Sequence, residues 1–270
     1  MRLGLSSFIY RYATSPTRSD APPMDACTML RRAYALGVDA VQFSDNLPLH
    51  TLDNGALAAL RDLGAEFGLG IEVGAKGLER DLLERYVALA GYFGSRALRL
   101  VLDEPDPERA RAGLAWLLPR LRAADLPLAI ENHGLLPAAT LAAIVERFDD
   151  PLLGFCVDTA NNLILLERPL ETVAALAPRA RQLHLKDYIV DKAPVGYRIT
   201  GCPLGQGSLD IGAVLGLVQP AERGLDVYLE SWMDPASTWG ETLLQEERWI
   251  ALCIERAQQW LGIGEENRTP

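Results

Sequence analysis

The sequence predicts an α/β fold, a single (β/α)8 barrel of the TIM type. Eight short apolar runs alternate with eight segments of helical period, and the length of 270 residues suits such a barrel. Each of the last four runs ends in a side chain of a type that binds metal ions. The carboxyl ends of all strands of a barrel meet at one rim, so residues far apart in the sequence can meet there. A doubly wound open sheet is the main alternative, but it would not bring the ends of its last four strands around one point.

The expected strands are rich in apolar residues, as buried parallel strands are. In chain order they cover residues 3–10, 38–45, 70–76, 97–103, 126–133, 153–158, 181–187 and 225–231. Each is followed by a segment with apolar residues at helical spacing and polar residues on the other face. These expected helices cover residues 24–36, 54–67, 79–93, 107–124, 137–148, 169–177, 209–218 and 241–261. We therefore expect one domain over residues 1–262 and a flexible tail over residues 263–270.

The composition indicates a soluble, cytoplasmic enzyme. Apolar residues make up 49% of the chain and charged residues 23%. No stretch approaches the roughly 20 apolar residues of a membrane span, and the first residues, MRLGLSSFIY, lack a secretory pattern because their apolar run is short. The cysteines form no CxxC pair and are expected to be reduced packing residues. They are Cys27, Cys156, Cys202 and Cys253.

The charge balance argues against a nucleic-acid partner. The net charge is −10, with 26 basic and 36 acidic residues. Such a surface repels a phosphate backbone unless a strong local patch opposes it, and no run of Lys and Arg is long enough to supply one. We expect neither a nucleic acid nor a membrane as partner, but a small molecule.

Four residues at the ends of the last four strands predict a metal site. They are Glu131, Asp158, His184 and Glu230. Burying a charge is costly unless it is paired or coordinated, and three carboxylates at one rim would repel one another. A divalent cation removes that conflict, and three oxygen ligands with one imidazole favour Mn²⁺ or Mg²⁺, with Co²⁺ or Zn²⁺ also suitable. The alternative is that each acid pairs with an arginine or a helix start.

The segments that carry these residues resemble a known superfamily. IENHG, FCVDTANN, HLKDY and YLESW are similar to the xylose isomerase-like TIM barrels, of the sugar phosphate isomerase/epimerase and AP endonuclease family 2 type. The resemblance covers nearly the whole chain, and its ligand order is specific for the superfamily but not for a substrate. It implies that the four residues are metal ligands, and that Glu131 and Glu230 also act as acid and base on opposite sides of the substrate. It also makes a dimer or tetramer plausible.

Two departures from the superfamily pattern narrow the expected activity. The endonuclease branch uses three metal ions and many histidines, whereas this chain has only His50, His133 and His184. The epimerase branch commonly has a histidine three residues after the second ligand, where this chain has Asn161. An asparagine can still donate a hydrogen bond to a substrate hydroxyl, so sugar binding is compatible with the change.

The resemblance and the ligand set together predict a metal-dependent sugar isomerase or epimerase. A metal-bound α-hydroxyketone forms an enediolate when one glutamate removes its proton. Return of the proton gives an epimer or an isomer. The alternative is a lyase, a dehydratase or decarboxylase of an oxo sugar acid, because loss of a β-hydroxyl or of CO₂ passes through a similar intermediate. A non-catalytic sugar-binding barrel is the third possibility.

Lys186 is a further candidate for catalysis. It follows His184 by two residues, so both side chains point to one face of the strand. It is one of three lysines among 26 basic residues, and its compact ammonium can contact a carboxylate, a phosphate or an enolate oxygen. The alternative is a structural salt bridge.

Other polar residues are expected to bind substrate. His133 shares the face of Glu131, while Gln42 and Glu72 are polar residues inside apolar runs, which can equally form a buried polar network. Residues 189–208 form the longest apparent connection and are expected to be an irregular lid or binding loop, or a subunit contact. Arg198, in that loop, could bind an anionic substrate group.

Overall fold

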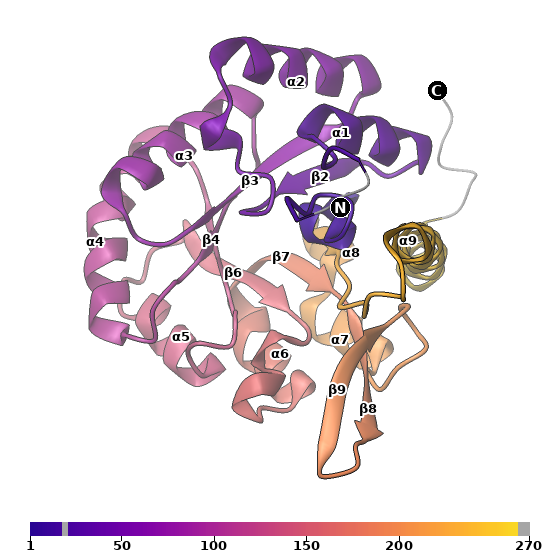
Figure 1. Ribbon diagram of the computed structural model, residues 1–270. Helices are drawn as coiled ribbons and strands as arrows, with labels where there is room; N and C mark the ends of the chain where they lie inside the picture. The colour runs from indigo at the N-terminus through magenta and orange to yellow at the C-terminus, as the bar shows by residue number, and fades with distance from the viewer. Residues whose placement is uncertain (18–20, 264–270) are drawn as a thin grey trace.

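The computed structural model describes residues 1–17 and 21–263 and closes eight parallel strands into a barrel, in the order β1-β10-β7-β6-β5-β4-β3-β2 (Figure 1). The predicted barrel is confirmed over the open sheet, and each strand overlaps the run expected for it. The strands are β1 (Leu3–Ser6), β2 (Ala40–Phe43), β3 (Gly70–Lys76), β4 (Leu98–Val101), β5 (Leu128–Glu131), β6 (Leu153–Asp158), β7 (Ala180–Leu185) and β10 (Asp226–Leu229). The expected tail, apart from Ile263, lies outside the described residues.

A ring of helices surrounds the strands (Figure 1). They are α1 (Ala26–Ala35), α2 (Asn54–Phe67), α3 (Arg80–Phe93), α4 (Pro107–Ala124), α5 (Ala138–Glu146), α6 (Pro169–Leu176), α7 (Ile211–Val218), α8 (Pro220–Arg223) and α9 (Trp239–Leu261). Side chains of Asp25, Asp53 and Asp210 cap the starts of α1, α2 and α7 by accepting backbone N–H groups. Gly68 ends α2 with a positive φ of 64°, which a residue with a Cβ rarely adopts. No helix of the described chain is both long and apolar enough to cross a membrane.

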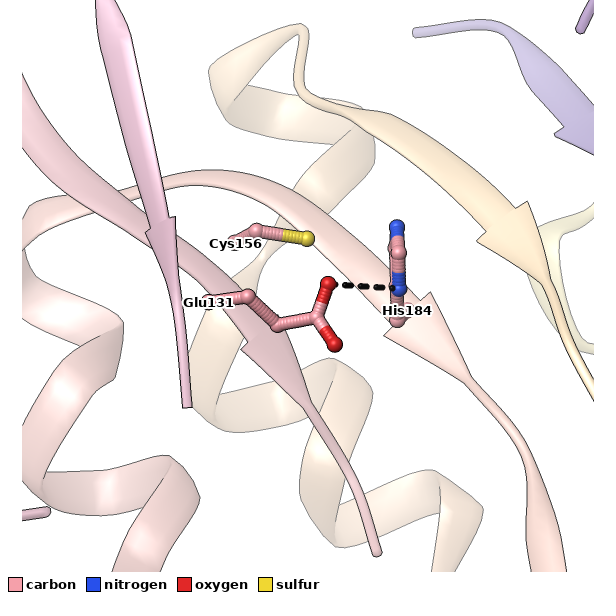
Figure 2. A group of neighbouring side chains, drawn as sticks. All are labelled: Glu131, Cys156 and His184. Atoms are coloured by element: carbon pink, nitrogen blue, oxygen red, sulfur yellow. Dashed lines mark ion pairs between the residues drawn. The ribbon is translucent and has the colours of Figure 1, made fainter. Parts of the chain in front are cut away.

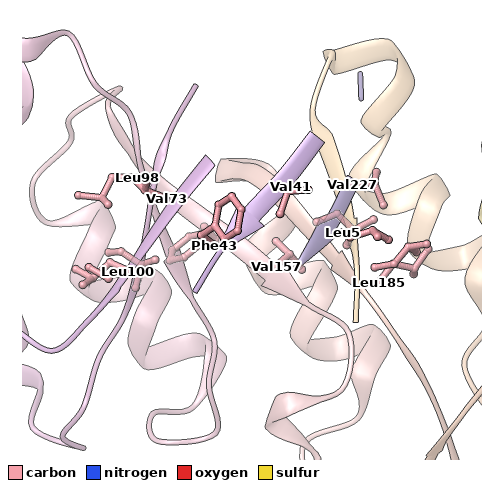
Figure 3. Close-up of a cluster of buried hydrophobic side chains, with 14 of the residues drawn as sticks. Leu5, Val41, Phe43, Val73, Leu98, Leu100, Val157, Leu185 and Val227 are labelled. Carbon is pink, nitrogen blue, oxygen red and sulfur yellow. The ribbon is translucent and has the colours of Figure 1, made fainter. Parts of the chain in front are cut away.

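The two faces of the barrel strands differ in polarity. Side chains that point toward the helices are apolar and buried and form the main core between strands and helices, with Leu5, Phe43 and Leu100 among them (Figure 3). The alternate side chains face the barrel axis and are mostly polar or small. A hydrogen bond of 2.9 Å from Gln42 Nε2 on β2 to Gln182 Oε1 on β7 crosses the interior between strands that are not neighbours. The barrel interior is therefore polar, which allows it to hold charged groups at one end.

Charged residues close the amino-terminal end of the barrel. Arg2 contacts Glu72 and lies 2.6 Å from Asp226 Oδ2, and Glu72 also accepts the backbone N–H of Arg96 at 3.0 Å. Glu72 faces the axis, but it lies four residues before Lys76, the last residue of β3. Four residues span about 13 Å along a strand. Glu72 thus lies in a buried polar network toward the amino-terminal end, away from the rim where its contact with substrate was expected.

The segment expected as an irregular loop contains a hairpin. Strands β8 (Asp187–Lys192) and β9 (Tyr197–Cys202) pair antiparallel, and the hairpin projects from the barrel beyond β7 (Figure 1). Gly196 has a φ of 82° in the turn. The β-branched residues of Tyr197–Cys202 favour a strand, but hydrogen bonding to the partner strand, which the sequence pattern does not show, decides the outcome.

Candidate functional site

A cavity of about 470 Å³ opens at the carboxyl-terminal rim of the barrel. Rim residues from several strands form it, as in barrels that bind ligands at this end. Its lining consists of Phe8, Arg11, Asp45, Lys76, Arg99, Glu131, His133, Asn161, Ile164, Lys186, Glu230, Ser231 and Trp232.

The structure brings the four predicted ligand residues together beside this cavity, which Glu131 and Glu230 line. From His184 Nδ1, the nearest carboxylate oxygens of Glu230, Glu131 and Asp158 lie at 3.1, 3.4 and 3.9 Å. Figure 2 shows Glu131 and His184 pointing toward each other, with the thiol of Cys156 beside them. All four side chains are buried. Strand ends 26 to 46 residues apart thus supply one cluster, since each residue stands at the end of its strand or one residue from it.

Gln42 orients the imidazole of His184. Gln42 Oε1 lies 2.7 Å from His184 Nε2, and the amide nitrogen of Gln42 donates to Gln182 Oε1, which fixes the direction of the amide. An amide oxygen can only accept, so Nε2 carries the hydrogen and Nδ1 faces the carboxylates. Gln42 does not line the cavity, so its contact is with the imidazole instead of the expected substrate.

The donor set fits a divalent cation. Three carboxylates and an imidazole nitrogen are suitable ligands, and two groups of three donors, Asp158 with His184 and Glu230, and Glu131 with Cys156 and His184, each lie within 4.8 Å of one another. His184 Nδ1 is buried, yet it makes no hydrogen bond of normal geometry within the described chain. A buried nitrogen without a hydrogen-bond partner, directed at three carboxylates, is the arrangement expected of a ligand atom.

Lys186 lies against two of the four residues. Its Nζ is 2.8 Å from Asp158 Oδ2 and donates a 2.9 Å hydrogen bond to Glu230 Oε2, and it stands 4.7 Å from the centre of the Trp232 ring. Burial lowers the pKa of Lys186, but Asp158 and Glu230 raise it further, so the ammonium stays charged. Burial raises the pKa of Glu230, whereas Lys186 and His184 bring it well below its usual value. Lys186 therefore takes part in a salt bridge and also lines the cavity.

Arg99 is a site residue that was not predicted from the sequence. It is 1% exposed on β4, its Nε donates to Glu131 Oε2, and its Nη1 makes no hydrogen bond within the described residues. Gly74 makes room for it, because a Cβ at that position would lie 3.1 Å from Arg99 Cδ. Burial raises the pKa of Glu131, but Arg99 and then His184 lower it below the usual value. The sequence does contain a signal for this residue, because Arg99 lies within the apolar run 97–103 and a buried guanidinium requires a partner.

The remaining predicted residues divide between the cavity and other places. Asn161 lines the cavity and donates a 2.9 Å hydrogen bond to Glu131 Oε1, and His133 lines it with an exposed side chain. Arg198 is 63% exposed on the hairpin, 3.4 Å from Asp234, and does not line the cavity. The expected contact of Arg198 with substrate is not supported, because the hairpin carries it away from the rim.

The fold and the cluster define a single-domain (β/α)8 barrel with a donor-rich cavity at its carboxyl-terminal rim. The chain belongs to the xylose isomerase-like TIM barrel family, whose sequence model matches residues 30–253. The resemblance predicted from the four ligand segments is thereby confirmed.

Known proteins similar to this chain include enzymes that act on sugars and sugar acids. A 3-oxo-isoapionate decarboxylase of Pectobacterium atrosepticum is 29% identical over 256 residues, which cover 92% of each chain. A xylose isomerase-like TIM barrel protein of Mycobacterium smegmatis, solved with magnesium, has a TM-score of 0.70 at 18% identity and covers 96% of this chain and 97% of its own. D-psicose 3-epimerase of Clostridium cellulolyticum H10, solved with D-tagatose, has a TM-score of 0.72 at 13% identity over 97% and 99%. The two structures support the fold.

Proposed function

We propose that this protein is a metal-dependent lyase that releases CO₂ from a small sugar acid with an oxo group β to its carboxylate. Glu131, Asp158, His184 and Glu230 would hold the divalent cation, Mn²⁺ or Mg²⁺ by their chemistry. When bound, such an ion stabilises negative charge that develops on a neighbouring carbonyl oxygen.

The pairing of the two glutamates with buried cations is the observation that carries this proposal. Arg99 Nε donates to Glu131 Oε2, and Lys186 Nζ donates a 2.9 Å hydrogen bond to Glu230 Oε2. Arg99 holds the pKa of Glu131 below its usual value, and Lys186 does the same for Glu230. Isomerisation and epimerisation require groups that take up a proton and give it back, and a carboxylate paired with a buried cation is a poor base. Loss of CO₂ from a β-oxo acid requires no base. Two glutamates that are each paired with a buried cation therefore suit decarboxylation better than proton shuttling.

The proposed reaction breaks the bond between the carboxylate carbon and the α-carbon. The electron pair of that bond stays on the α-carbon and is shared with the neighbouring carbonyl oxygen, while CO₂ leaves. One proton from solvent then adds to the α-carbon, which balances the reaction. Lys186, charged and lining the cavity, is placed to face the negative charge on the carbonyl oxygen. Arg99 and Asn161 orient Glu131, because Arg99 donates to its Oε2 and Asn161 donates to its Oε1.

The similarity to the Pectobacterium decarboxylase supports the same reaction type. That relative is named for a substrate with an oxo group and a carboxylate, and the match extends over 92% of both chains.

A sugar isomerase or epimerase is the second candidate. Glu131 on β5 and Glu230 after β10 line one cavity, and β6 and β7 separate their strands in the barrel order. Two carboxylates on different sides of one substrate are what proton exchange at a carbon requires.

Product analysis in D₂O separates the candidates. The purified protein with Mn²⁺ would be incubated with β-oxo sugar acids and, separately, with neutral ketoses, and the products analysed by mass spectrometry. The proposal predicts loss of CO₂ from the acid and one deuterium in the product. Deuterium exchange into a ketose without loss of mass would support the isomerase instead, and loss of water from the acid would indicate a dehydratase.

A further inference from the structure

The two halves of the barrel rim carry different chemistry. The metal-type donors come from β5, β6, β7 and β10, which are consecutive in the barrel order. The other half consists of β1, β2, β3 and β4, and besides Phe8 it contributes three cations and one carboxylate to the cavity. They are Arg11 after β1, Asp45 after β2, Lys76 at the end of β3 and Arg99 on β4. A ligand that spans the cavity therefore meets oxygen and nitrogen donors at one end and positive charge at the other.

The positive charge of this second half is only partly neutralised. Asp45 is the one carboxylate among the described cavity residues of this half, and it lies 3.6 Å from Lys76 Nζ and 4.0 Å from Arg99 Nη1. Arg99 is committed to Glu131 through its Nε. Arg11 is exposed and lines the cavity. Of the three cations, Arg11 and Lys76 are the two that reach solvent, Lys76 beside Asp45, whereas Arg99 is buried.

We propose that Arg11 and Lys76 bind the carboxylate of the substrate, an inference that rests on the proposed lyase function and names its substrate class as small monocarboxylic hydroxy or oxo acids. The oxo group then faces the donor half, and the length of the acid must match the cavity between them. Arg99 closes the floor of the cationic half and positions Glu131. The carboxylate site predicted at Arg198 is replaced by one on the opposite side of the cavity.

Arg11 and Lys76 are exposed to solvent, which suits the binding of a carboxylate that is lost during the reaction. Negative charge moves from the carboxylate to the carbonyl oxygen as the carbon–carbon bond breaks. A contact that stabilises the carboxylate more than the transition state lowers KM but does not raise kcat. Lys76 is 47% exposed, so water screens its attraction for the substrate carboxylate. This screening limits how far Lys76 stabilises the bound substrate relative to the transition state. Loss of either cation should therefore raise KM and leave kcat nearly unchanged.

Binding without turnover tests the site directly. Threonate, a four-carbon hydroxy acid, and threitol, its neutral counterpart, would be titrated into the Mn²⁺-loaded protein by calorimetry. The variants are Arg11→Met, Lys76→Met and, as a matched control on the hairpin, Lys192→Met. We expect wild type and Lys192→Met to prefer threonate, and each of the other variants to lose about tenfold in threonate affinity with threitol unaffected. Because threonate can also chelate the metal ion, the titrations are repeated without metal, where the dependence on Arg11 and Lys76 should persist.

The outcomes separate this inference from the proposed function. Equal binding of threonate and threitol by wild type, or unchanged threonate affinity in both variants, would overturn the carboxylate site. Release of CO₂ with unchanged KM in Arg11→Met and Lys76→Met would also overturn it while the lyase stands. Charge-selective binding lost in both variants, without CO₂ release from any oxo acid, would support the site and reject the lyase. Both side chains are exposed, so thermal unfolding should show intact folds.

Discussion

Replacing Arg99 by methionine should strongly destabilise the metal-free protein, because Glu131 would remain buried without its guanidinium. The two side chains are 1% and 2% exposed, and Arg99 Nε donates to Glu131 Oε2. Removing one partner of a buried ion pair costs about 3–5 kcal/mol, whereas replacing both by neutral groups is often nearly neutral. Asn161 continues to donate to Glu131 Oε1 at 2.9 Å. We therefore expect a loss near the lower limit, about 3 kcal/mol in the free energy of unfolding.

The loss should depend on pH with a definite sign. The folded pKa of Glu131 lies below its ordinary value, with burial opposed by Arg99 and His184. A carboxyl group of this kind stabilises the fold above its unfolded pKa, and the contribution disappears as the pH falls through the folded pKa. Wild type therefore has the full contribution at neutral pH. In Arg99→Met the deficit should be largest at neutral pH and smaller at acidic pH, where Glu131 takes up a proton.

Urea unfolding of chelator-treated protein measures this effect. The set comprises wild type, Arg99→Met, Glu131→Gln and the double variant, with Arg109→Met as a control because Arg109 is 57% exposed in its pair with Glu104. The control should change stability by less than about 0.5 kcal/mol, and the double variant should be more stable than Arg99→Met alone. An Arg99→Met loss no larger than the control's, or a double variant whose loss is the sum of the single losses, would refute the reasoning.

Three further predictions concern the metal site and catalysis. Gln42→Leu removes the acceptor that fixes the His184 tautomer, so Mn²⁺ affinity measured by calorimetry should fall about 10–100-fold; unchanged affinity would remove Gln42 from this role. Lys186→Met should lower the rate of CO₂ release about 10²–10³-fold while Mn²⁺ remains bound, and a normal rate would show that Lys186 is only structural. Burial lowers the pKa of His184, but Cys156, Glu230 and Glu131 raise it well above the usual value. Mn²⁺ binding should therefore release a proton near neutral pH and strengthen as the pH rises; the proton count comes from calorimetry in two buffers of different ionisation enthalpy, and an affinity independent of pH would contradict the assignment.

The barrel could be predicted because its signal repeats eight times. Each apolar run and each helical segment is weak evidence alone, but their regular alternation permits few other folds. The hairpin β8–β9 was missed because it lies outside the repeat and is held by pairing between its own two strands. Its exposed residues Val195 and Tyr197 give no buried face for a pattern to reveal.

The donor half of the site could be predicted because strand ends determine it. Glu131, Asp158 and His184 stand at or beside the ends of successive strands, and alternation then places Lys186 on the same side. The alternation of side chains along a strand shows which face a residue is on, but not how far along the barrel axis it lies. Glu72 was therefore expected at the rim, although it lies toward the amino-terminal end. The cationic half escaped prediction for a different reason. Arg11 directly follows the short helical turn Ser7–Tyr10 after β1, and only the path of the chain through space brings it to the cavity.

The most direct test of the proposed function is the fate of the substrate carboxylate. A β-oxo sugar acid with carbon-13 in its carboxylate would be incubated in D₂O with the Mn²⁺-loaded protein, and the labelled carbon followed by NMR and by mass spectrometry of the gas phase. The proposal predicts one labelled CO₂ for each substrate consumed and one deuterium at the former α-carbon of the product. Labelled carbon that stays in the product, with deuterium exchanged at a neighbouring carbon, would contradict the lyase and point to an isomerase or epimerase.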